Sequence, residues 1–396
     1  RLCGVRILFR NGRIHTTAVR GATALLVDGA QVTWLGEEDG AALQSAERTV
    51  DLAGAFVTPA FVDAHVHTTA TGLSLTDLNL SGAATLAEAL DLVERAGRAG
   101  RGRPILGAGW DETCWPERRP PTRAELDRAA YGGAVYLARV DAHGAAVSSA
   151  LAAAVPHLAT LAGYSADGLL TGPAHDAART AALATLRPGQ LREAQRAALQ
   201  HAGSLGIACV HEMAGPAISS AEDLRGLLEL AGAEPVPEVI GYWGELLGIE
   251  TARELGAVGA AGDLFCDGSL GSHTAALREP YADRPENTGL LRFETGELAE
   301  HLLRCAAAGL QAGFHAIGDA AVDQVLDAVA LAGERLGRSA GAGNRIEQAE
   351  FVRDPGRLAA SGLVASVQPG FDAAWGGPDG MYAARLGPDR AIRLNR

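Results

Sequence analysis

The sequence predicts an α/β fold of the (β/α)8, TIM-like barrel type, preceded by a small β unit. Beyond Ala55, apolar runs of strand length alternate with stretches whose apolar residues recur at helical spacing, which is typical of βαβ units and a parallel sheet. Several runs end in polar, chemically capable side chains, and a barrel gathers its active-site groups at the carboxyl ends of its strands. A doubly wound open sheet is the alternative, but neither a G-x-G-x-x-G motif nor a P-loop supports it.

The first 55 residues contain short β-rich runs separated by tight turns. Asn11-Gly12 and Asp28-Gly29 each lie between two such runs, and these dipeptides favour hairpin turns. The segment carries no obvious chemistry. We therefore expect residues 1–55 to form a small β unit and residues 56–396 to form the barrel.

Helix-then-strand units follow one another in the second half of the chain. Apolar residues at helical spacing mark Leu191 to Leu205, and a strand-like run then ends at His211 and Glu212. Two further units place His315 and Glu347 at the ends of their strands. We expect His211 to line the substrate site.

Residues 105–188 fit a simple βα rhythm poorly. This segment holds Gly109-Trp110-Asp111, a Pro-rich turn and Arg139-x-Asp141-x-His143. We expect it to be an insertion between barrel strands that shapes the substrate pocket, with Trp110, Asp111 and His143 as substrate-binding residues.

The charge and cysteine content of the sequence indicate which partners and which cellular compartment to expect. The formal net charge of −13, with no basic stripe, argues against a nucleic-acid partner. The five cysteines are far apart and form no C-x-x-C pair, which favours a reducing cytoplasm. The chain has neither a basic-then-apolar leader nor an apolar run of membrane-spanning length, so we expect no membrane association. A small-molecule substrate and a possible homo-oligomer are the partners that we expect. Because the sequence begins at Arg1, we also expect its start to be incomplete.

Every cation in the sequence is arginine or histidine, because the chain contains no lysine. A Schiff-base lysine, a lysine general base and a carboxylated-lysine metal bridge are therefore all excluded.

The strongest chemical signal is the run from Phe61 to His67. His65 and His67 are two residues apart on a predicted strand, so their imidazoles point to the same face and can bind one ion. Imidazole is a common ligand of zinc and related metals. His315, at a strand-to-helix junction, is placed to be a third nitrogen ligand.

Asp263 and Asp267 bracket another predicted strand, and a Gly/Ser turn follows them. Either carboxylate can ligate a metal or act as an acid or base. We expect both to be catalytic. A serine hydrolase is a further alternative, but no G-x-S-x-G elbow is present, and Ser148, Ser149 and Ser269 have no assigned base.

These segments resemble the metal-dependent amidohydrolase superfamily, and within it the amidohydrolase 3 group that includes N-substituted formamide deformylase. The resemblance implies a barrel with a small β-sandwich beside it. It also implies hydrolysis of a non-peptide carbon–nitrogen bond, in an amide, formamide or cyclic amide, by metal-activated water. From the candidate ligands themselves, with no lysine to bridge two metals, we expect one divalent ion, zinc, rather than two. The marks that carry it are His65-x-His67, Gly109-Trp110-Asp111, Arg139-x-Asp141-x-His143, Gly206-Ile207 to His211-Glu212, Asp267-Gly268-Ser269-Leu270-Gly271, His315 to Asp319 and Arg345-Ile346-Glu347.

The sequence departs from the family pattern at three places. Asp263 stands where relatives often carry lysine, and Gln348 stands where the family usually has a histidine ligand. The last barrel strand with its aspartate, and the closing sandwich strands, have no counterpart before Arg396, so we expect a truncated barrel. A truncated or decayed non-catalytic homologue that binds a small molecule or a partner is the alternative function.

Overall fold

The computed structural model describes residues 4–100, 102–392 and 394, so Cys3 lies outside the described residues. The chain divides into two compact units, Arg1–Phe61 and Val62–Arg396. The division falls six residues after the predicted boundary at residue 55.

The first unit is built on a four-stranded sheet of order β4-β3-β1-β5. The Asp28-Gly29 turn joins two antiparallel strands, as predicted. The predicted hairpin at Asn11-Gly12 is wrong, because the strand after this turn pairs in parallel with a strand at residues 56–57. The elements are β1 (Arg6–Arg10), β2 (Arg13–Ile14), β3 (Ala24–Asp28), β4 (Gln31–Gly36), α1 (Glu38–Ala41), β5 (Arg48–Asp51) and β6 (Phe56–Val57).

The second unit contains a barrel-like, nearly closed parallel sheet of seven strands. Their order, β18-β17-β16-β15-β14-β13-β7, is the reverse of chain order, so consecutive strands are neighbours. This α/β architecture confirms the predicted class of fold. The strands are β7 (Phe61–Val66), β13 (Ile207–Ala214), β14 (Glu238–Trp243), β15 (Gly259–Ala260), β16 (Gln311–Ala316), β17 (Arg345–Gln348) and β18 (Val364–Ser366).

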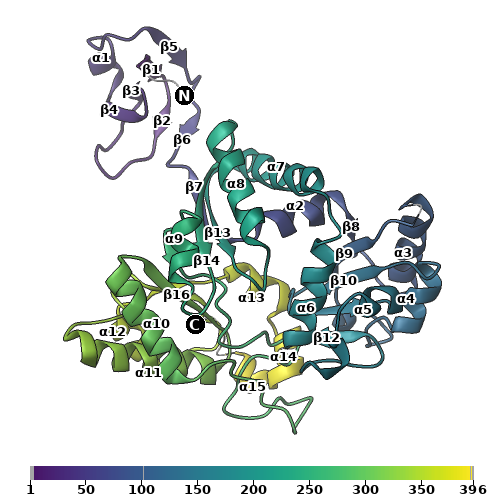
Figure 1. Ribbon diagram of the computed structural model, residues 1–396. Coiled ribbons are helices and arrows are strands. Elements are labelled where there is room, and N and C mark those ends of the chain that lie inside the picture. Colours follow the sequence, from purple (N-terminus) through teal and green to yellow (C-terminus); the bar gives the residue numbers. More distant parts are fainter. Residues whose placement is uncertain (1–3, 101, 393, 395–396) are drawn as a thin grey trace. The chain divides into compact units, whose positions relative to one another are not determined.

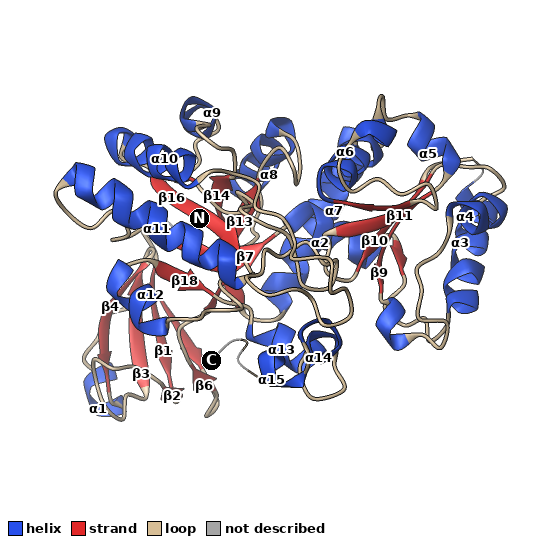
Figure 2. Cartoon of the chain, turned by 90° about the horizontal axis from the view of Figure 1, so that it is seen from below, coloured by secondary structure: helices blue, strands red, loops and turns tan. Residues whose placement is uncertain are grey.

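Amphipathic helices cover this sheet and bury its main hydrophobic core (Figure 2). Val322, Val325 and Val329 form one apolar face of a long helix and are each at most 5% exposed. Burying a side chain of this size stabilises the fold by about 1.5–3 kcal/mol. The helices are α7 (Pro188–Ser204), α8 (Ala221–Ala233), α9 (Ile249–Glu254), α10 (Thr295–Ala308), α11 (Asp319–Leu336) and α12 (Pro355–Ser361).

The segment after β7 forms a second, five-stranded sheet with its own helices and cores (Figure 1). The predicted insertion at 105–188 is therefore part of a larger layer whose first strand begins at Leu78. The strands, in the order β12-β11-β10-β9-β8, are β8 (Leu78–Asn79), β9 (Ile105–Trp110), β10 (Val135–Arg139), β11 (Gly144–Val147) and β12 (Leu169–Thr171). Its helices are α3 (Leu86–Gly100), α4 (Arg123–Ala129), α5 (Ser149–Ala153) and α6 (Gly172–Leu183), with short 3-10 turns at Glu112–Cys114 and Leu158–Thr160.

Four further helices complete the second unit. One follows the His65-x-His67 strand directly, and three follow β18. They are α2 (Thr68–Thr76), α13 (Pro369–Trp375), α14 (Met381–Leu386) and α15 (Pro388–Ala391). Among the described helices, none combines the length and apolar character that a bilayer-spanning segment needs.

Candidate metal site and pocket

His65 and His67 lie at the carboxyl end of β7, with their ring centroids 5.3 Å apart. Asp263 reaches them from the segment that follows β15. Ligating atoms of His65, His67 and Asp263 all lie within 4.8 Å of one another. We refer to these three residues as the His-His-Asp site.

The Asp263 carboxylate is the centre of this group. Its Oδ2 lies 2.9 Å from His67 Nε2, and its Oδ1 lies 3.5 Å from His65 Nε2 and 3.2 Å from His315 Nδ1. The side chain is only 4% exposed. Burial opposes ionisation, but the charges of His65 and His67 hold the pKa of Asp263 well below its usual value.

The remaining ring nitrogens are oriented by other partners. Nδ1 of His65 donates to Glu347 Oε2 at 2.9 Å, and Nδ1 of His67 donates to the Met213 carbonyl at 3.1 Å. Both Nε2 atoms are therefore left facing Asp263. A histidine ligand whose other nitrogen donates to a carboxylate or a carbonyl is a common feature of metal sites.

Glu347 is itself fixed by Arg345, two residues earlier on β17. Arg345 Nε donates to Glu347 Oε1 at 2.6 Å, and Nη2 donates to Oε2 at 3.1 Å. Burial lowers the pKa of His65, but the Asp263 and Glu347 carboxylates outweigh burial and raise it to about 10. The positive charge that these carboxylates favour can be a proton or a bound cation.

Gln348 ends β17 beside His65. Its Nε2 lies 3.5 Å from His65 Nε2, while its Oε1 is buried without a hydrogen-bond partner in the described structure. Gln348 and Ala349 both adopt the left-handed conformation, with φ of 70° and 45°. A buried amide oxygen without a partner, in a residue that lies beside one imidazole of the His-His-Asp site, fits a site for a divalent cation.

His315, the expected third nitrogen ligand, lies beside this group rather than within it. Its Nδ1 faces Asp263, and its Nε2 lies 3.2 Å from the Gly268 carbonyl. The structure thus places His315 as a neighbour of the Asp263 carboxylate.

The structure does not bring Asp267 to the His-His-Asp site. Its fully buried carboxylate accepts hydrogen bonds from the backbone N–H groups of Ala276, Ile317 and Gly318, at 2.8, 3.0 and 2.8 Å. Burial outweighs these hydrogen bonds and raises the pKa of Asp267 to about 6. This geometry ties the loop after Asp267 to the start of α11.

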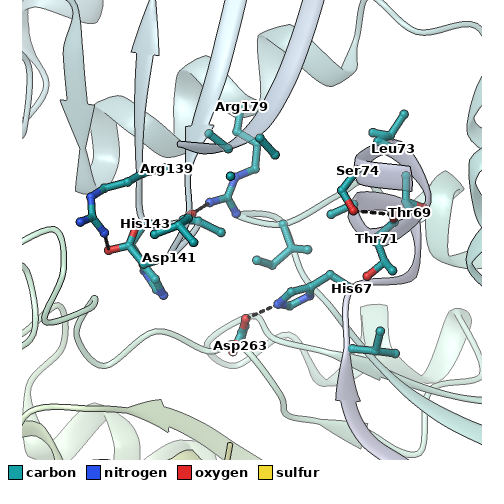
Figure 3. Close-up of a pocket in the computed structure, with 18 of the residues that line it drawn as sticks. His67, Thr69, Thr71, Leu73, Ser74, Arg139, Asp141, His143, Arg179 and Asp263 are labelled. Carbon is teal, nitrogen blue, oxygen red and sulfur yellow. Dashed lines mark hydrogen bonds and ion pairs between the residues drawn. The ribbon is translucent and has the colours of Figure 1, made fainter. Parts of the chain in front are cut away.

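A cavity of about 680 Å³ opens beside the His-His-Asp site. One wall comes from β7, α2 and the segment around Asp263, and the other comes from the five-stranded sheet and α6 (Figure 3). The volume is that of pockets that bind small organic molecules. Apolar side chains that line it include Leu73, Leu106, Leu183, Ile218, Phe265 and Phe371.

His143, which the sequence predicts to be a substrate-binding residue, lines this cavity. Its ring lies 5.1 Å from the His315 ring and 5.2 Å from the Phe265 ring, measured between centroids. Burial, and then the nearby charge of His315, lower the pKa of His143 to about 3. The imidazole is therefore neutral near pH 7.

Trp110, Asp111 and His211 are not among the residues that line this cavity, which corrects their expected placement. Trp110 is 1% exposed, and its indole N–H donates to the Leu137 carbonyl at 2.8 Å, so this side chain belongs to a hydrophobic core. Asp111 accepts a hydrogen bond from the Thr113 N–H and pairs with Arg139. His211 Nδ1 lies 3.3 Å from Arg345.

Three polar side chains at this cavity were not predicted from the sequence to be site residues: Asp141, Arg179 and Glu350. Asp141 Oδ2 accepts from Ser269 Oγ at 2.6 Å and from Ser272 Oγ at 2.8 Å, and it lies 3.1 Å from Arg139. The alternation Arg139-x-Asp141-x-His143 was the available signal. Arg179 and Glu350 also line the cavity, and burial raises the pKa of Glu350 to about 7.

Comparison with known proteins agrees with this geometry. A family model described as the amidohydrolase family matches residues 48–396. This chain belongs to the amidohydrolase family. Within the family it is similar to a putative amidohydrolase, YtcJ, of Bacillus subtilis, with 27% identity over 86% of this chain and 67% of that protein. Protein LONG AFTER FAR-RED 3 of Arabidopsis thaliana is 30% identical over 87% of this chain, which spans 63% of the length of that protein.

Three further proteins are similar to this chain, one in sequence and two in structure. N-substituted formamide deformylase of Arthrobacter pascens is 32% identical over 36% of this amidohydrolase chain and 28% of that protein. The crystal structure of an uncharacterized metal-dependent hydrolase from Pyrococcus horikoshii covers 98% of this chain, with a TM-score of 0.75 and 28% identity, over 79% of its own length. A second such hydrolase, from Pyrococcus furiosus, gives a TM-score of 0.71 and 30% identity over 99% of this chain and 82% of its own.

Proposed function

We propose that this amidohydrolase is a metal-dependent hydrolase that cleaves a non-peptide carbon–nitrogen bond in an amide, a formamide or a cyclic amide. The observation that carries the proposal is the convergence of His65, His67 and Asp263 at the edge of a cavity of small-molecule size. The similarity to a protein named as a formamide deformylase supports this class of bond.

In this proposal His65, His67 and Asp263 would hold one divalent cation, zinc. Gln348, whose amide lies beside His65 and whose Oε1 is buried without a partner, would supply an additional oxygen ligand. When bound, a zinc ion supplies Lewis acidity, which polarises a carbonyl and lowers the pKa of water to about 7.

The protein's own side chains bind the substrate and move the protons. The neutral imidazole of His143 donates a hydrogen bond to the amide carbonyl oxygen, which orients the scissile group. Asp263, ionised at neutral pH, accepts at Oδ1 the proton released when water attacks the carbonyl carbon. The same oxygen returns that proton to the departing amine nitrogen, so the number of protons balances. His315, beside Oδ1, stabilises the charged carboxylate.

The broader organisation is part of the same proposal. Residues 56–396 would form the catalytic barrel, and residues 1–55 the β-sandwich portion. The described cysteines Cys114, Cys209, Cys266 and Cys305 are free thiols, which supports a reducing compartment such as the cytoplasm. The substrate in this proposal is a small molecule.

The test measures metal content and hydrolysis together. Plasma mass spectrometry of the purified protein should give about one zinc per chain, and a His65→Ala, His67→Ala variant should lose it. His157→Ala, His201→Ala is the matched control, because both of these histidines are exposed. Turnover of N-formyl and simple amide substrates should follow the metal.

The opposite outcome is equally clear. No metal in either protein after growth with added zinc, and no turnover across the panel, would overturn the proposal. That result would favour the alternative of a non-catalytic homologue. Thermal unfolding of each variant separates loss of the metal from loss of the fold.

A further inference from the structure

Arg179, on α6, presents its guanidinium to the cavity (Figure 3). Two backbone carbonyls hold it in place: Nη1 donates to Ala217 at 2.8 Å, and Nη2 donates to Ala142. Its position is therefore fixed without the help of a charged partner.

Arg179 has no ion-pair partner among the described residues. No carboxylate in the described part of the chain lies within 4.0 Å of its guanidinium. Asp176, on the same helix, is instead paired with Arg292 at 2.8 Å. The His175 ring, 3.3 Å away, also carries no negative charge, and burial lowers its pKa well below the usual value.

Arg139 shows how this chain neutralises a buried arginine. Its guanidinium lies within 3.2 Å of Asp111, 2.9 Å of Glu112 and 3.1 Å of Asp141. Arg139 and Arg179 are the arginines among the described residues that line the cavity, so Arg179 is the one whose positive charge is available to a ligand.

The cavity also offers apolar side chains to the remainder of a ligand. Leu106, Ala138, Leu183 and Ile218 line the same cavity. A guanidinium binds a carboxylate through charge-assisted hydrogen bonds, here from the N–H groups that do not donate to Ala217 and Ala142.

We infer that Arg179 is a carboxylate-binding subsite, so that the substrate is an amide that carries a carboxylate at a distance from its scissile bond. This inference rests on the proposed function. The amide group lies at the His-His-Asp site, an apolar spacer contacts the leucine and isoleucine side chains, and the carboxylate binds Arg179.

The experiment compares two probes that differ only in the carboxylate: N-benzylformamide and 4-(formamidomethyl)benzoate. Binding by calorimetry and kcat/KM are measured for the wild type, Arg179→Gln and Arg179→Lys. We expect the wild type to prefer the carboxylate probe by on the order of tenfold or more. Arg179→Gln should abolish the preference, and Arg179→Lys should retain part of it, because the charge remains while the planar fork is lost.

Arg192→Gln is the matched control, because this arginine pairs with Glu229 on the surface of α7 and should leave the preference intact. Equal binding and turnover of the two probes by the wild type would overturn the inference while leaving the proposed function standing. If the carboxylate probe binds in an Arg179-dependent way but neither probe is hydrolysed, the carboxylate subsite stands and the proposed hydrolysis of these amides is overturned. Failure of both probes to bind at millimolar concentration would overturn the inference.

Discussion

The two walls of the cavity shift the pKa of a buried histidine in opposite directions. On the wall formed by β7 and the Asp263 segment, His65 lies between two carboxylates, which raise its pKa to about 10. On the wall formed by the five-stranded sheet, His143 is buried near the charge of His315, and its pKa falls to about 3. The first arrangement attracts a cation, and the second keeps a neutral imidazole for hydrogen bonding. Both histidines are buried, so their different pKa values come from the charged groups beside them.

Of the changes that test this contrast, removing the negative charge of Glu347 beside His65 should have the largest effect. In Glu347→Gln the His65 Nδ1–H keeps an acceptor but loses its carboxylate, and Arg345 loses its ion pair. We expect zinc affinity to fall about 10- to 100-fold, as for other partners of metal ligands. Competition with a chromophoric chelator measures the affinity, and Glu334→Gln on the exposed side of α11 is the control. An unchanged affinity would show that Glu347 does not position His65.

The pH dependence of stability sharpens the contrast in the metal-free protein. The folded pKa of His143 lies below the unfolded value of about 6.5, so its contribution is present above pH 6.5 and is lost as the pH falls towards 3. The folded pKa of His65 lies above that value, so its contribution is present below pH 6.5 and is lost as the pH rises through 10.

The two contributions can be separated by substitution. His143→Gln should flatten the acid limb of the free energy of unfolding by about 1–2 kcal/mol, and His65→Gln should flatten the alkaline limb instead. Urea unfolding in the presence of EDTA, between pH 4.5 and about 9, measures both limbs. If His143→Gln leaves the acid limb unchanged, His143 does not titrate as its burial implies.

The smallest effect concerns Trp110. Trp110→Phe removes the donor to the Leu137 carbonyl and should lower the free energy of unfolding by about 1 kcal/mol, without changing KM. A raised KM at unchanged stability would instead support the role in substrate binding that the sequence predicted.

The first wall could be predicted from the sequence and the second largely could not. His65 and His67 follow from strand periodicity, because alternate residues share a face whatever the rest of the fold does. The barrel-like sheet follows from the alternation of helix and strand patterns. Asp263 and Asp267 looked equivalent in the sequence, but only the folded loop shows that backbone N–H groups occupy the second carboxylate.

The second wall depends on contacts between distant segments. Trp110 was predicted to bind substrate but is buried in a hydrophobic core, and Arg179 was not predicted to line the cavity. Local residue spacing does not distinguish a side chain that faces a core from one that faces a cavity. Asp141 was visible only as one member of an alternating run, and its serine partners come from more than a hundred residues later in the chain.

The turn at the end of β17 places a side chain beside the His-His-Asp site in a backbone conformation that lowers the stability of the fold. Gln348 and Ala349 are two successive residues with side chains in the left-handed region, where each costs about 1–3 kcal/mol. That turn brings the Gln348 amide to His65 and leads the chain on to Glu350. Glycine would relieve the strain at Gln348, and it would also delete the amide. Selection for thermal stability will therefore favour glycine at this position, whereas selection for hydrolytic activity will favour glutamine.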